Sequence, residues 1–407
     1  MNHPLRFVVA AHALSTYGSF LNMVALGLFA LDLTDSTVQT GLFMAVRLAA
    51  GFLAGPLAGV LVARHPRERL MVGADLLSAG TLVSLVVAPS VGQPVVLYAL
   101  AVVLGAGQTL WGVALRSGIP DLVAPDRLAR ANAHLVAARS TAMLLGFGTS
   151  GVVVTVLGYH AAFLLDAATY VLSALLLTRV GGWRPTAAHR PSTGRPYGLR
   201  VRHALSGVAP VVLAMVAVRA ADAFGSASHN VGLPVYATAT RPDAPASFAA
   251  LFTASWAVGS LVVSRLLARR LRAGPVSPLA FGLATCAMSV LFVSAFTGPP
   301  LWLLVVVVVA AGMADGYAEI SYTTRLQAVE PSRRAHLFGL AGAVQNAGFG
   351  LGMVVSAVAL DQFAPFPVIA AAHGLALVAA VVFLVSQLRF PQRRARRPAV
   401  QKVEVPP

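Results

Sequence analysis

The sequence predicts an all-α membrane protein with twelve transmembrane helices in two pseudo-symmetric six-helix bundles. Three observations support this fold class: the composition, the spacing of the apolar segments, and the placement of the basic residues. Of the 407 residues, 57% are hydrophobic and only 11% are charged, whereas soluble proteins carry roughly a quarter charged residues. The mean hydropathy is +0.77. So few charges cannot cover a water-exposed globule of this length.

The apolar segments follow one another between Pro, Gly and charged residues, many near the length of about 20 residues that crosses a bilayer. The first segment is too long for a signal-peptide core and lacks a clear cleavage site, so we expect it to be retained. In chain order the predicted helices are 7–31, 41–63, 70–89, 95–117, 134–157, 161–180, 207–236, 247–270, 277–297, 301–324, 336–359 and 366–388.

The basic residues are concentrated in alternate connections. The odd-numbered connections together hold one cation, Arg241, whereas the first even-numbered connection alone holds Arg64, Arg67 and Arg69. Short cation-rich loops stay in the cytoplasm during insertion. We therefore expect a multi-pass protein with both termini cytoplasmic. The richness in Ala, Val, Gly and Arg with almost no Lys indicates a bacterial source, so the expected location is the bacterial plasma membrane. The net charge of +16 comes from such loops rather than from one basic face, so no nucleic-acid partner is expected.

The longest connection follows residue 180 and is rich in Pro, Gly and Arg, as flexible linkers are. It separates six predicted helices from six. VAPDR (123–127) and VEPSR (329–333) precede corresponding helices of the two halves. Duplicated halves are a common plan among transporters. The predicted organisation is an N-terminal bundle (1–180), a cytoplasmic linker (181–206), a C-terminal bundle (207–390) and a basic cytoplasmic tail (391–407).

The connection after the second predicted helix carries Gly59, Leu61, Arg64 and Arg67, and with this motif residues 5–390 resemble the major facilitator superfamily. Its motif after the second helix has the form Gly-x-Leu-x-Asp-Arg-x-Gly-Arg, and here Ala63 replaces the Asp and Pro66 replaces the second Gly. The Asp latches the cytoplasmic gate in the family, so the resemblance leaves open whether Glu68, Asp75 or Asp121 substitutes for it. The matching residues, expected to form the gating motif, are Gly59, Leu61, Arg64 and Arg67.

Two further segments, 119–140 and 162–177, are similar to the twelve-helix branch that includes macrolide-efflux and siderophore-export permeases. GFGTSG (146–151) resembles the antiporter motif Gly-Pro-x-x-Gly-Gly, with Phe147 in place of the Pro. The resemblance implies efflux by a multidrug-resistance type of antiporter. The glycines that would belong to its gate are Gly146, Gly148 and Gly151.

Polar side chains follow one face of several predicted helices at steps of three or four residues. An ionised group at mid-bilayer costs about 2.5–3.5 kcal/mol on insertion scales, so each one requires a partner or a function. The clearest faces carry Arg219, Asp222, Ser226, His229 and Asn230 in 207–236, Asp315, Glu319 and Tyr322 in 301–324, and His12, Ser15, Ser19 and Asn22 in 7–31.

In the superfamily, the first, fourth, seventh and tenth helices line a central cavity, which is where most of these faces fall. We expect Asp166 to be a packing residue, and Arg47 and Arg139 to lie near helix ends. The expected substrate-cavity residues are Ser19, Asn22, Gln108, Trp111, Arg219, Ser226, His229, Asn230, Trp256, Tyr322 and Asn346.

We expect Asp222, Asp315 and Glu319 to couple transport to protons. Asp315 and Glu319 are four residues apart and repel when both are ionised, which favours a shared proton. In the alternative, Arg219 and Asp222 neutralise one another as a structural pair.

The sequence contains no ATP-binding loop, no Cys/His metal spacing and no nucleophile elbow, so we expect no enzyme activity, no metal and no cofactor. The expected function is proton-coupled export of a small organic compound, such as a drug, a macrolide-like product or a siderophore, by alternating access. The alternatives are a proton-linked importer of a nutrient or siderophore and a non-transporting sensor. The expected partners are substrate, protons and lipid, with a monomer as the family default.

Overall fold

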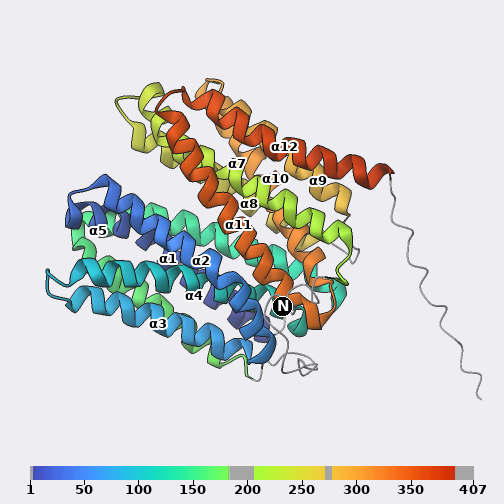
Figure 1. The fold of residues 1–407 in the computed structure, drawn as a ribbon, viewed down its shortest axis with the longest axis horizontal. Coiled ribbons are helices and arrows are strands. Elements are labelled where there is room, and N and C mark those ends of the chain that lie inside the picture. Colours follow the sequence, from blue (N-terminus) through green and yellow to red (C-terminus); the bar gives the residue numbers. More distant parts are fainter. Residues whose placement is uncertain (1–2, 182, 184–205, 271–276, 390–407) are drawn as a thin grey trace, which may run out of the picture.

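The computed structural model describes residues 3–181, 183, 206–270 and 277–389 and shows an all-helical chain (Figure 1). Nearly all of the predicted linker and the whole predicted tail lie outside these residues. Within the described part, eleven helices are long and apolar enough to cross a membrane. They are α1 (His3–Thr34), α2 (Thr37–Arg64), α3 (Arg67–Val87), α4 (Gln93–Leu122), α5 (Leu128–Thr178), α7 (Pro210–Thr240), α8 (Pro245–Arg270), α9 (Pro278–Ala295), α10 (Leu301–Gln327), α11 (Pro331–Leu360) and α12 (Pro365–Arg389), with a short 3-10 turn η1 (Pro125–Arg127) before α5.

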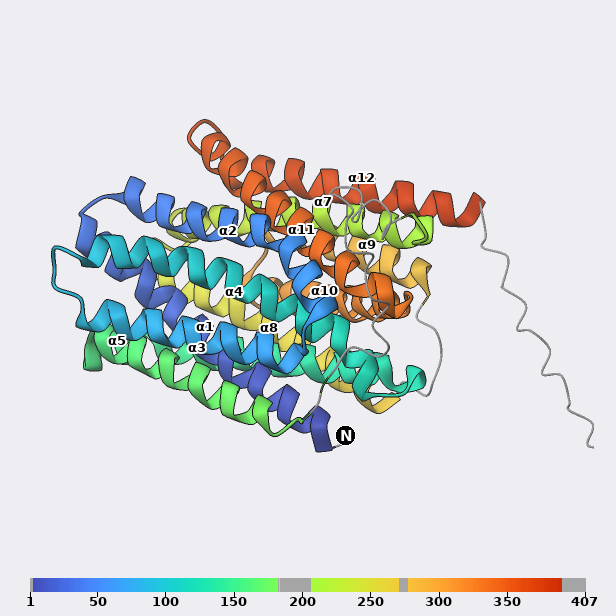
Figure 2. The same ribbon diagram turned by 60° about the horizontal axis from the view of Figure 1, so that its bottom comes forward.

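Helix α5 contains two of the predicted spans. Its 51 residues would measure about 77 Å as a straight helix, more than twice the roughly 30 Å of a bilayer core. Gly158 interrupts the helix with a φ of 80° and a ψ of 173°, a conformation that is accessible because glycine has no Cβ. Figure 2 shows the chain turning back at the end of the molecule where α5 is labelled. The sequence gap between 157 and 161 therefore falls on a reversal of the chain.

Local sequence explains where several helices begin. Proline suits the first helical turn because its missing N–H would have no partner there in any case. At the start of α2, the Ser36 hydroxyl accepts a hydrogen bond of 3.3 Å from the backbone N–H of Gln39, as helix-capping serines do. The helices that begin at proline are α7 (Pro210), α8 (Pro245), α9 (Pro278), α11 (Pro331) and α12 (Pro365).

Large apolar side chains cover much of the outer surface. Four examples that are at least two-thirds exposed are Leu53, Val87, Val156 and Leu388. An apolar surface of this extent would be unfavourable in water. In a bilayer these side chains lie in hydrocarbon, so their exposure is consistent with a membrane-embedded surface.

The packing of the helices repeats when their numbers are shifted by six. Helix α1 packs on α5 and α2 on α4, as α7 packs on α11 and α8 on α10. The two most extensive contacts between the groups, α2 with α11 and α5 with α8, are exchanged by the same shift. Figure 1 shows α1 to α5 as one group of helices and α7 to α12 as the other.

The connections of the described chain lie at two ends of the bundle. We call the end with connections 65–66, 123–127 and 328–330 the basic end, because Arg64, Arg67, Arg127, Arg333 and Arg334 lie at or beside these connections. The opposite end carries connections 35–36, 88–92 and 361–364 (Figure 2).

Candidate substrate cavity

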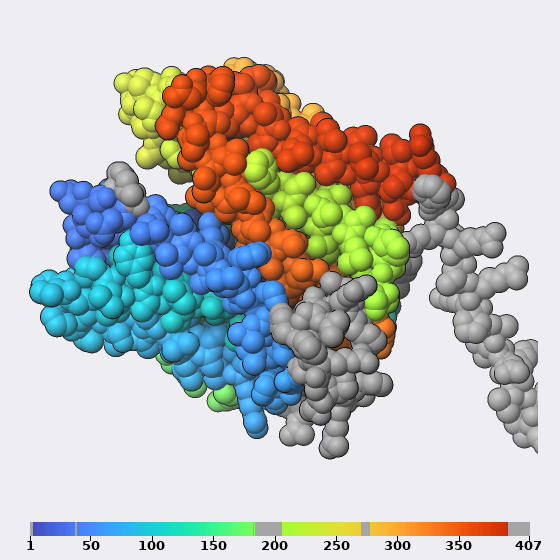
Figure 3. Space-filling view, viewed as in Figure 1, coloured from blue at the N-terminus to red at the C-terminus, as the bar shows by residue number. Residues whose placement is uncertain are grey.

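A cavity of about 1030 Å³ lies between the two groups of helices. Its lining includes Leu233 and Ala249, close to the connection 241–244 at the opposite end, and continues to Glu319 and Phe338. Figure 3 shows the surface hollowed at that end, between the blue helices of the first group and the yellow-green end of α7. Small-molecule sites typically measure about 300–1,000 Å³, so the cavity can hold a drug-sized compound.

At the basic end the two groups of helices touch along α2 and α11. A Cβ on Gly55 would lie 2.6 Å from the carbonyl oxygen of Gly339, and one on Gly59 would lie 3.0 Å from that of Ala335. Both distances are shorter than a Cβ normally tolerates. The absence of side chains at these glycines therefore allows the two helix backbones to approach one another directly.

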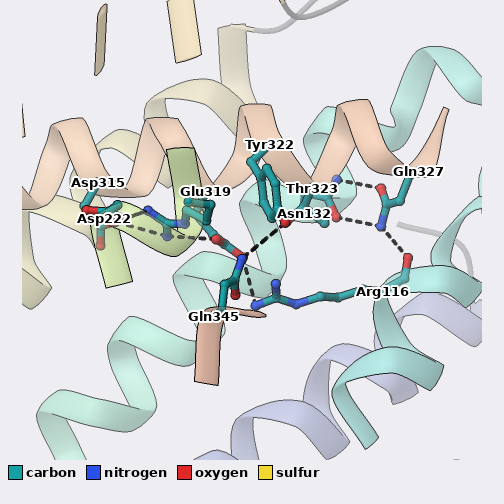
Figure 4. Close-up of polar contacts among 10 residues, drawn as sticks. Arg116, Asn132, Asp222, Asp315, Glu319, Tyr322, Thr323, Gln327 and Gln345 are labelled. Atoms are coloured by element: carbon teal, nitrogen blue, oxygen red, sulfur yellow. Dashed lines mark hydrogen bonds and ion pairs between the residues drawn. The ribbon is translucent and has the colours of Figure 1, made fainter. Parts of the chain in front are cut away.

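Polar side chains extend this closure across α4, α5 and α10. The Asn132 side-chain amide donates to Thr324 at 2.8 Å and to the Gln327 side-chain oxygen at 2.7 Å. The Gln327 amide donates in turn to the backbone oxygen of Arg116 at 2.8 Å (Figure 4). Deeper in the bundle, the Ser140 hydroxyl donates to that of Ser260 at 3.1 Å. Together with the α2–α11 contact, these bonds close the basic end.

The predicted gating motif also lies at the basic end. Arg67 forms a buried ion pair with Asp121 of α4. The other carboxylate oxygen of Asp121 lies 3.8 Å from Nη1 of Arg334, on α11 of the second group. Arg334 also donates to the backbone oxygen of Ser117 at 3.4 Å. Asp121 therefore connects the two groups of helices.

The other two acids considered for the latch have different partners. Glu68 accepts a hydrogen bond of 2.5 Å from the backbone N–H of Trp183. Asp75 is buried and accepts from Ser173 at 2.7 Å and from the Trp111 indole at 3.4 Å. All three bonds lie within the first 183 residues and do not reach the second group of helices.

The remaining motif residues differ in their surroundings. Leu61 lies in the last turn of α2, and Arg64 ends that helix with an exposed side chain. Gly146 packs closely against Tyr17 and Phe20 of α1. Gly148 lines the cavity, whereas nothing lies within 4 Å of a Cβ on Gly151. Close packing thus requires a glycine at position 146 but not at 151.

A cluster of charged side chains lies on the cavity wall between α7 and α10. Arg219 donates to Asp222 at 2.5 Å, to Asp315 at 3.2 Å and to Glu319 at 2.9 Å. Glu319 also pairs with Arg116 of α4 at 2.9 Å. Figure 4 shows Asp222, Asp315 and Glu319 converging on one point, with Arg116 reaching Glu319 from the first group.

This cluster corrects the sequence argument about helix α10. We expected the repulsion between Asp315 and Glu319, when both are ionised, to favour a shared proton. Arg219 and Arg116 instead reach the two acids from other helices. The alternative, a structural pair of Arg219 and Asp222, exists as an ion pair but is part of this larger network.

Most of the predicted cavity residues lie around the open space. A smaller cavity of about 350 Å³ adjoins the main one and is lined by Ser19 and Trp111, with His12 stacked on the Trp111 ring at 5.3 Å between centroids. The predicted residues that line the main cavity are Gln108, Arg219, Asp222, Ser226, His229, Asn230, Trp256, Asp315, Glu319 and Asn346.

Two predicted cavity residues were placed wrongly. Asn22 is buried and donates a hydrogen bond of 2.6 Å to Asp166, on the second segment of α5. Tyr322 is fully buried behind the cavity wall and accepts a hydrogen bond of 3.2 Å from Gln345. A polar face on one helix does not show whether it meets open space or a neighbouring helix. Asp166 has the packing role that we expected, since it is fully buried between Asn22 and Thr169.

Three cavity arginines were missed. Arg47 and Arg139 were expected near helix ends and Arg116 was not considered, yet all three line both cavities. Arg47 follows ten residues of α2, and Arg139 follows eleven residues of α5. At 1.5 Å per residue they lie about 15 Å and 17 Å from these helix starts. The sequence did contain a signal for these arginines, namely their positions inside apolar segments. A cation this deep in an apolar span requires a polar partner or water.

Within the described residues, no group of three or more His, Cys, Asp or Glu side chains is arranged to hold a metal ion. The expectation of no metal and no cofactor stays a prediction.

The family model described as "Major Facilitator Superfamily" matches residues 8–329. A relative from Sinorhizobium fredii (strain NBRC 101917 / NGR234), named as the uncharacterized MFS-type transporter y4rN, is 26% identical over 373 residues. The match covers 87% of this chain and 88% of the relative.

Solved structures share the fold at low sequence identity. A bacterial homologue of the iron transporter ferroportin in an outward-facing state has a TM-score of 0.76 at 15% identity, covering 96% of this chain and 100% of its own. The human organic anion transporter MFSD10 (TETRAN) has a TM-score of 0.76 at 14% identity, covering 94% and 100%. The transporter FucP in the outward conformation has a TM-score of 0.74 at 14% identity, covering 94% and 98%. These similarities establish the fold and not the substrate.

Proposed function

Because the chain belongs to the Major Facilitator Superfamily, whose members are transporters and not enzymes, we propose that it is a proton-coupled secondary transporter that exports a small organic compound by alternating access. The observation that carries this proposal is a drug-sized cavity between two groups of helices that is closed at the basic end. A transporter must expose such a cavity to one side of the membrane at a time. The structure supports the arrangement in which the cavity is closed at the basic end and accessible from the opposite end.

We assign twelve membrane spans by counting α5 as two, 128–157 and 159–178, because of the reversal at Gly158. The repeated helix packing supports two six-helix bundles, residues 1–180 and 207–390, joined by the linker 181–206. The excess of arginine at the basic end supports a cytoplasmic location for that end and for both termini. With this orientation the structure is the outward-open arrangement of a transporter in the bacterial plasma membrane.

In this mechanism the gate at the basic end opens as the opposite end closes. Opening requires loss of the α2–α11 contact, of the Asn132–Gln327 bonds and of the contact between Asp121 and Arg334. Asp121 keeps Arg67 on its own side of the gate, so the pair within the first bundle survives. The missing Asp of the family motif is thereby replaced by Asp121.

We propose the charged cluster around Arg219 as the coupling site. The three carboxylates of Asp222, Asp315 and Glu319 share the two arginines that pair with them, Arg219 and Arg116. The three acids outnumber the two arginines paired with them, so Asp222 or Asp315 can take up a proton while both arginines keep a carboxylate partner. Protonation of Glu319 also weakens its bond to Arg116, which joins the two bundles. A proton bound here can therefore bias the equilibrium between the two arrangements.

Vesicle transport tests the coupling role. Exchanging Asp315→Asn together with Glu319→Gln should abolish gradient-driven transport, because neither side chain can then bind and release a proton. The protein should still insert, since amides keep the shape of the carboxylates. Asp126→Asn is a matched control, because Asp126 is exposed and pairs only loosely with Arg127 at 4.0 Å. Undiminished uphill transport by the double variant would contradict the proposed coupling role.

We propose export as the direction because segments 119–140 and 162–177 resemble the exporter branch of the family. A second candidate, proton-linked import, is favoured by the arginines of the cavity. Protonating a carboxylate increases the positive charge beside them, so a proton and a negatively charged solute would assist each other's binding. Flux measured in right-side-out and inverted vesicles distinguishes the two directions.

A further inference from the structure

Arg47 and Arg139 are cavity cations that the charged cluster does not use. Within the described part of the chain, neither guanidinium makes a hydrogen bond or an ion pair. Arg139 is exposed and Arg47 half-buried, and both line the main cavity and the smaller one beside it. Each guanidinium carries five N–H donors and stays charged at any physiological pH.

The position of these arginines makes their lack of a partner significant. They lie about 15 Å and 17 Å along α2 and α5, near the middle of the spans, where a charge without a partner is costly. Arg219 and Arg116, on the same cavity, are both paired with carboxylates. The first bundle therefore keeps two cations facing open space at a cost that a purely structural role does not explain.

The acids near the cavity act on these two arginines electrostatically, Asp166 on Arg47 and Asp315 and Glu319 on Arg139, but none forms an ion pair with either of them. Asp222, Asp315 and Glu319 are all bound to Arg219. Asp75 is buried and bound to Ser173 and Trp111. A positively charged solute would have to break the Arg219 network to reach a carboxylate. A negatively charged solute finds two guanidinium groups already unoccupied.

The rest of the cavity wall suits the apolar part of such a solute. Phe20 and Phe147 lie together with ring centroids 5.1 Å apart, and both line the cavity. Trp256 and Phe349 line it as well. Aromatic and aliphatic walls with a few convergent polar groups are typical of sites for small organic molecules.

We infer that the transported compound is an organic anion whose carboxylate, or a comparable acidic group, is bound by Arg47 and Arg139 in the cavity. Guanidinium groups bind carboxylates through paired, charge-assisted hydrogen bonds. The apolar body of the solute lies against the aromatic wall. This inference rests on the proposed function, because it assumes that the cavity is the path of the solute.

A binding experiment tests the charge preference with three probes of one shape. Purified protein in detergent is titrated with 2-naphthoate, 2-naphthamide and 2-(aminomethyl)naphthalene, which are anionic, neutral and cationic at pH 7, and thermal stabilisation is measured. The carboxylate should bind at least about tenfold more tightly than the other two, because bonds between ionised groups are roughly twice as strong as neutral ones. A carboxylate that binds no better than the amide or the amine overturns the inference.

Substitutions then assign the site. Arg47→Gln and Arg139→Gln should each weaken binding of 2-naphthoate about tenfold and leave that of the amide unchanged. Arg127→Gln is the matched control, because this arginine is exposed on η1 outside the cavity. Equal binding of 2-naphthoate by the wild type and both cavity variants would exclude these arginines as the site.

The outcome separates this inference from the proposed function. Binding in detergent requires no gradient and no transport. Anion binding through Arg47 and Arg139 without flux in vesicles would contradict the transport proposal alone. Flux of 2-(aminomethyl)naphthalene without preference for the carboxylate would contradict the anion inference alone.

Discussion

Arg219 is the residue on which the charged wall of the cavity depends. Its guanidinium touches the carboxylates of Asp222, Asp315 and Glu319, and all four side chains are largely buried. Removing one partner of a buried ion pair leaves a charge that is neither paired nor fully hydrated. The stability of the second bundle should therefore be sensitive to this one side chain.

We expect Arg219→Gln to lower the free energy of unfolding by about 3 kcal/mol, the low end of the range for breaking a buried pair. Thermal unfolding in detergent measures the change. Arg241→Gln, at an exposed arginine in the connection after α7, is the control and should unfold like the wild type. Adding Asp222→Asn to Arg219→Gln should recover part of the loss. Equal stability of the two arginine variants would show that the carboxylates are satisfied without Arg219.

The sequence predicted this wall more successfully than the wall opposite. On α7 the polar positions 219, 222, 226, 229 and 230 repeat with helical spacing, and the structure places all five at the cavity. Arg139 was misplaced because the predicted helix began at 134, whereas α5 begins at Leu128. The six additional residues, almost two turns, move Arg139 from a helix end into the middle of a span.

At the scale of elements, the gate depends on the close approach of α2 and α11. Gly55 and Gly59 have no side chain between the two backbones. The ion pair of Arg67 with Asp121 and the hydrogen bonds between Asn132 and Gln327 also stabilise the closed basic end. They do not set the distance between α2 and α11. A larger residue on this line should therefore act as a wedge.

We expect Gly55→Val to shift the protein away from the arrangement closed at the basic end, because its Cβ would lie 2.6 Å from the carbonyl oxygen of Gly339. Extra bulk in a packed contact typically costs about 1–3 kcal/mol. In a C286S background, a cysteine placed by A335C reports on the contact through its rate of reaction with a maleimide. That rate should rise several-fold.

Gly73→Val provides the matched control, because nothing lies within 4 Å of a Cβ at this position of α3. The reaction rate at A335C should not change in that variant. Equal protection of A335C in the Gly55 and Gly73 variants would contradict the role of the glycine contact.

The sequence could not predict which helices meet at this gate. Gly59 was identified through the family motif, but its contact with Ala335 joins segments almost 280 residues apart. Likewise, the Asn22 side chain lies on a polar helix face, and only the position of Asp166 shows that the face meets another helix. Periodicity identifies a face, whereas the neighbour of that face depends on packing between distant segments.

At the scale of the whole molecule, the orientation rests on the distribution of arginine between the two ends. Connections at the basic end hold several cations, while the only cation in the odd-numbered connections is Arg241. The positive-inside rule turns this asymmetry into a direction. The direction then determines which side of the membrane the cavity faces.

We expect a cysteine placed by S192C in the linker to be protected in intact cells from a membrane-impermeant maleimide, in a C286S background. It should react only after the cells are opened. Val91 lies in the connection between α3 and α4 at the opposite end and is 91% exposed, so V91C should react in intact cells. Labelling of S192C in intact cells would reverse the orientation and with it the assignment of the gate.

Asp121 has a further consequence for how the molecule cycles. Its carboxylate pairs with Arg67 inside one bundle and reaches Arg334 across the gate only at 3.8 Å. When the basic end opens, Asp121 keeps its ion pair with Arg67 and loses only its long contact with Arg334. Its carboxylate therefore does not become an unpaired charge in hydrocarbon. This limits the cost of opening at Asp121, and in general a gap of a few kcal/mol leaves the minor form about 0.1–10% populated. In the proposed mechanism, thermal motion is then sufficient to interconvert the two arrangements, and the proton gradient determines the direction of net transport.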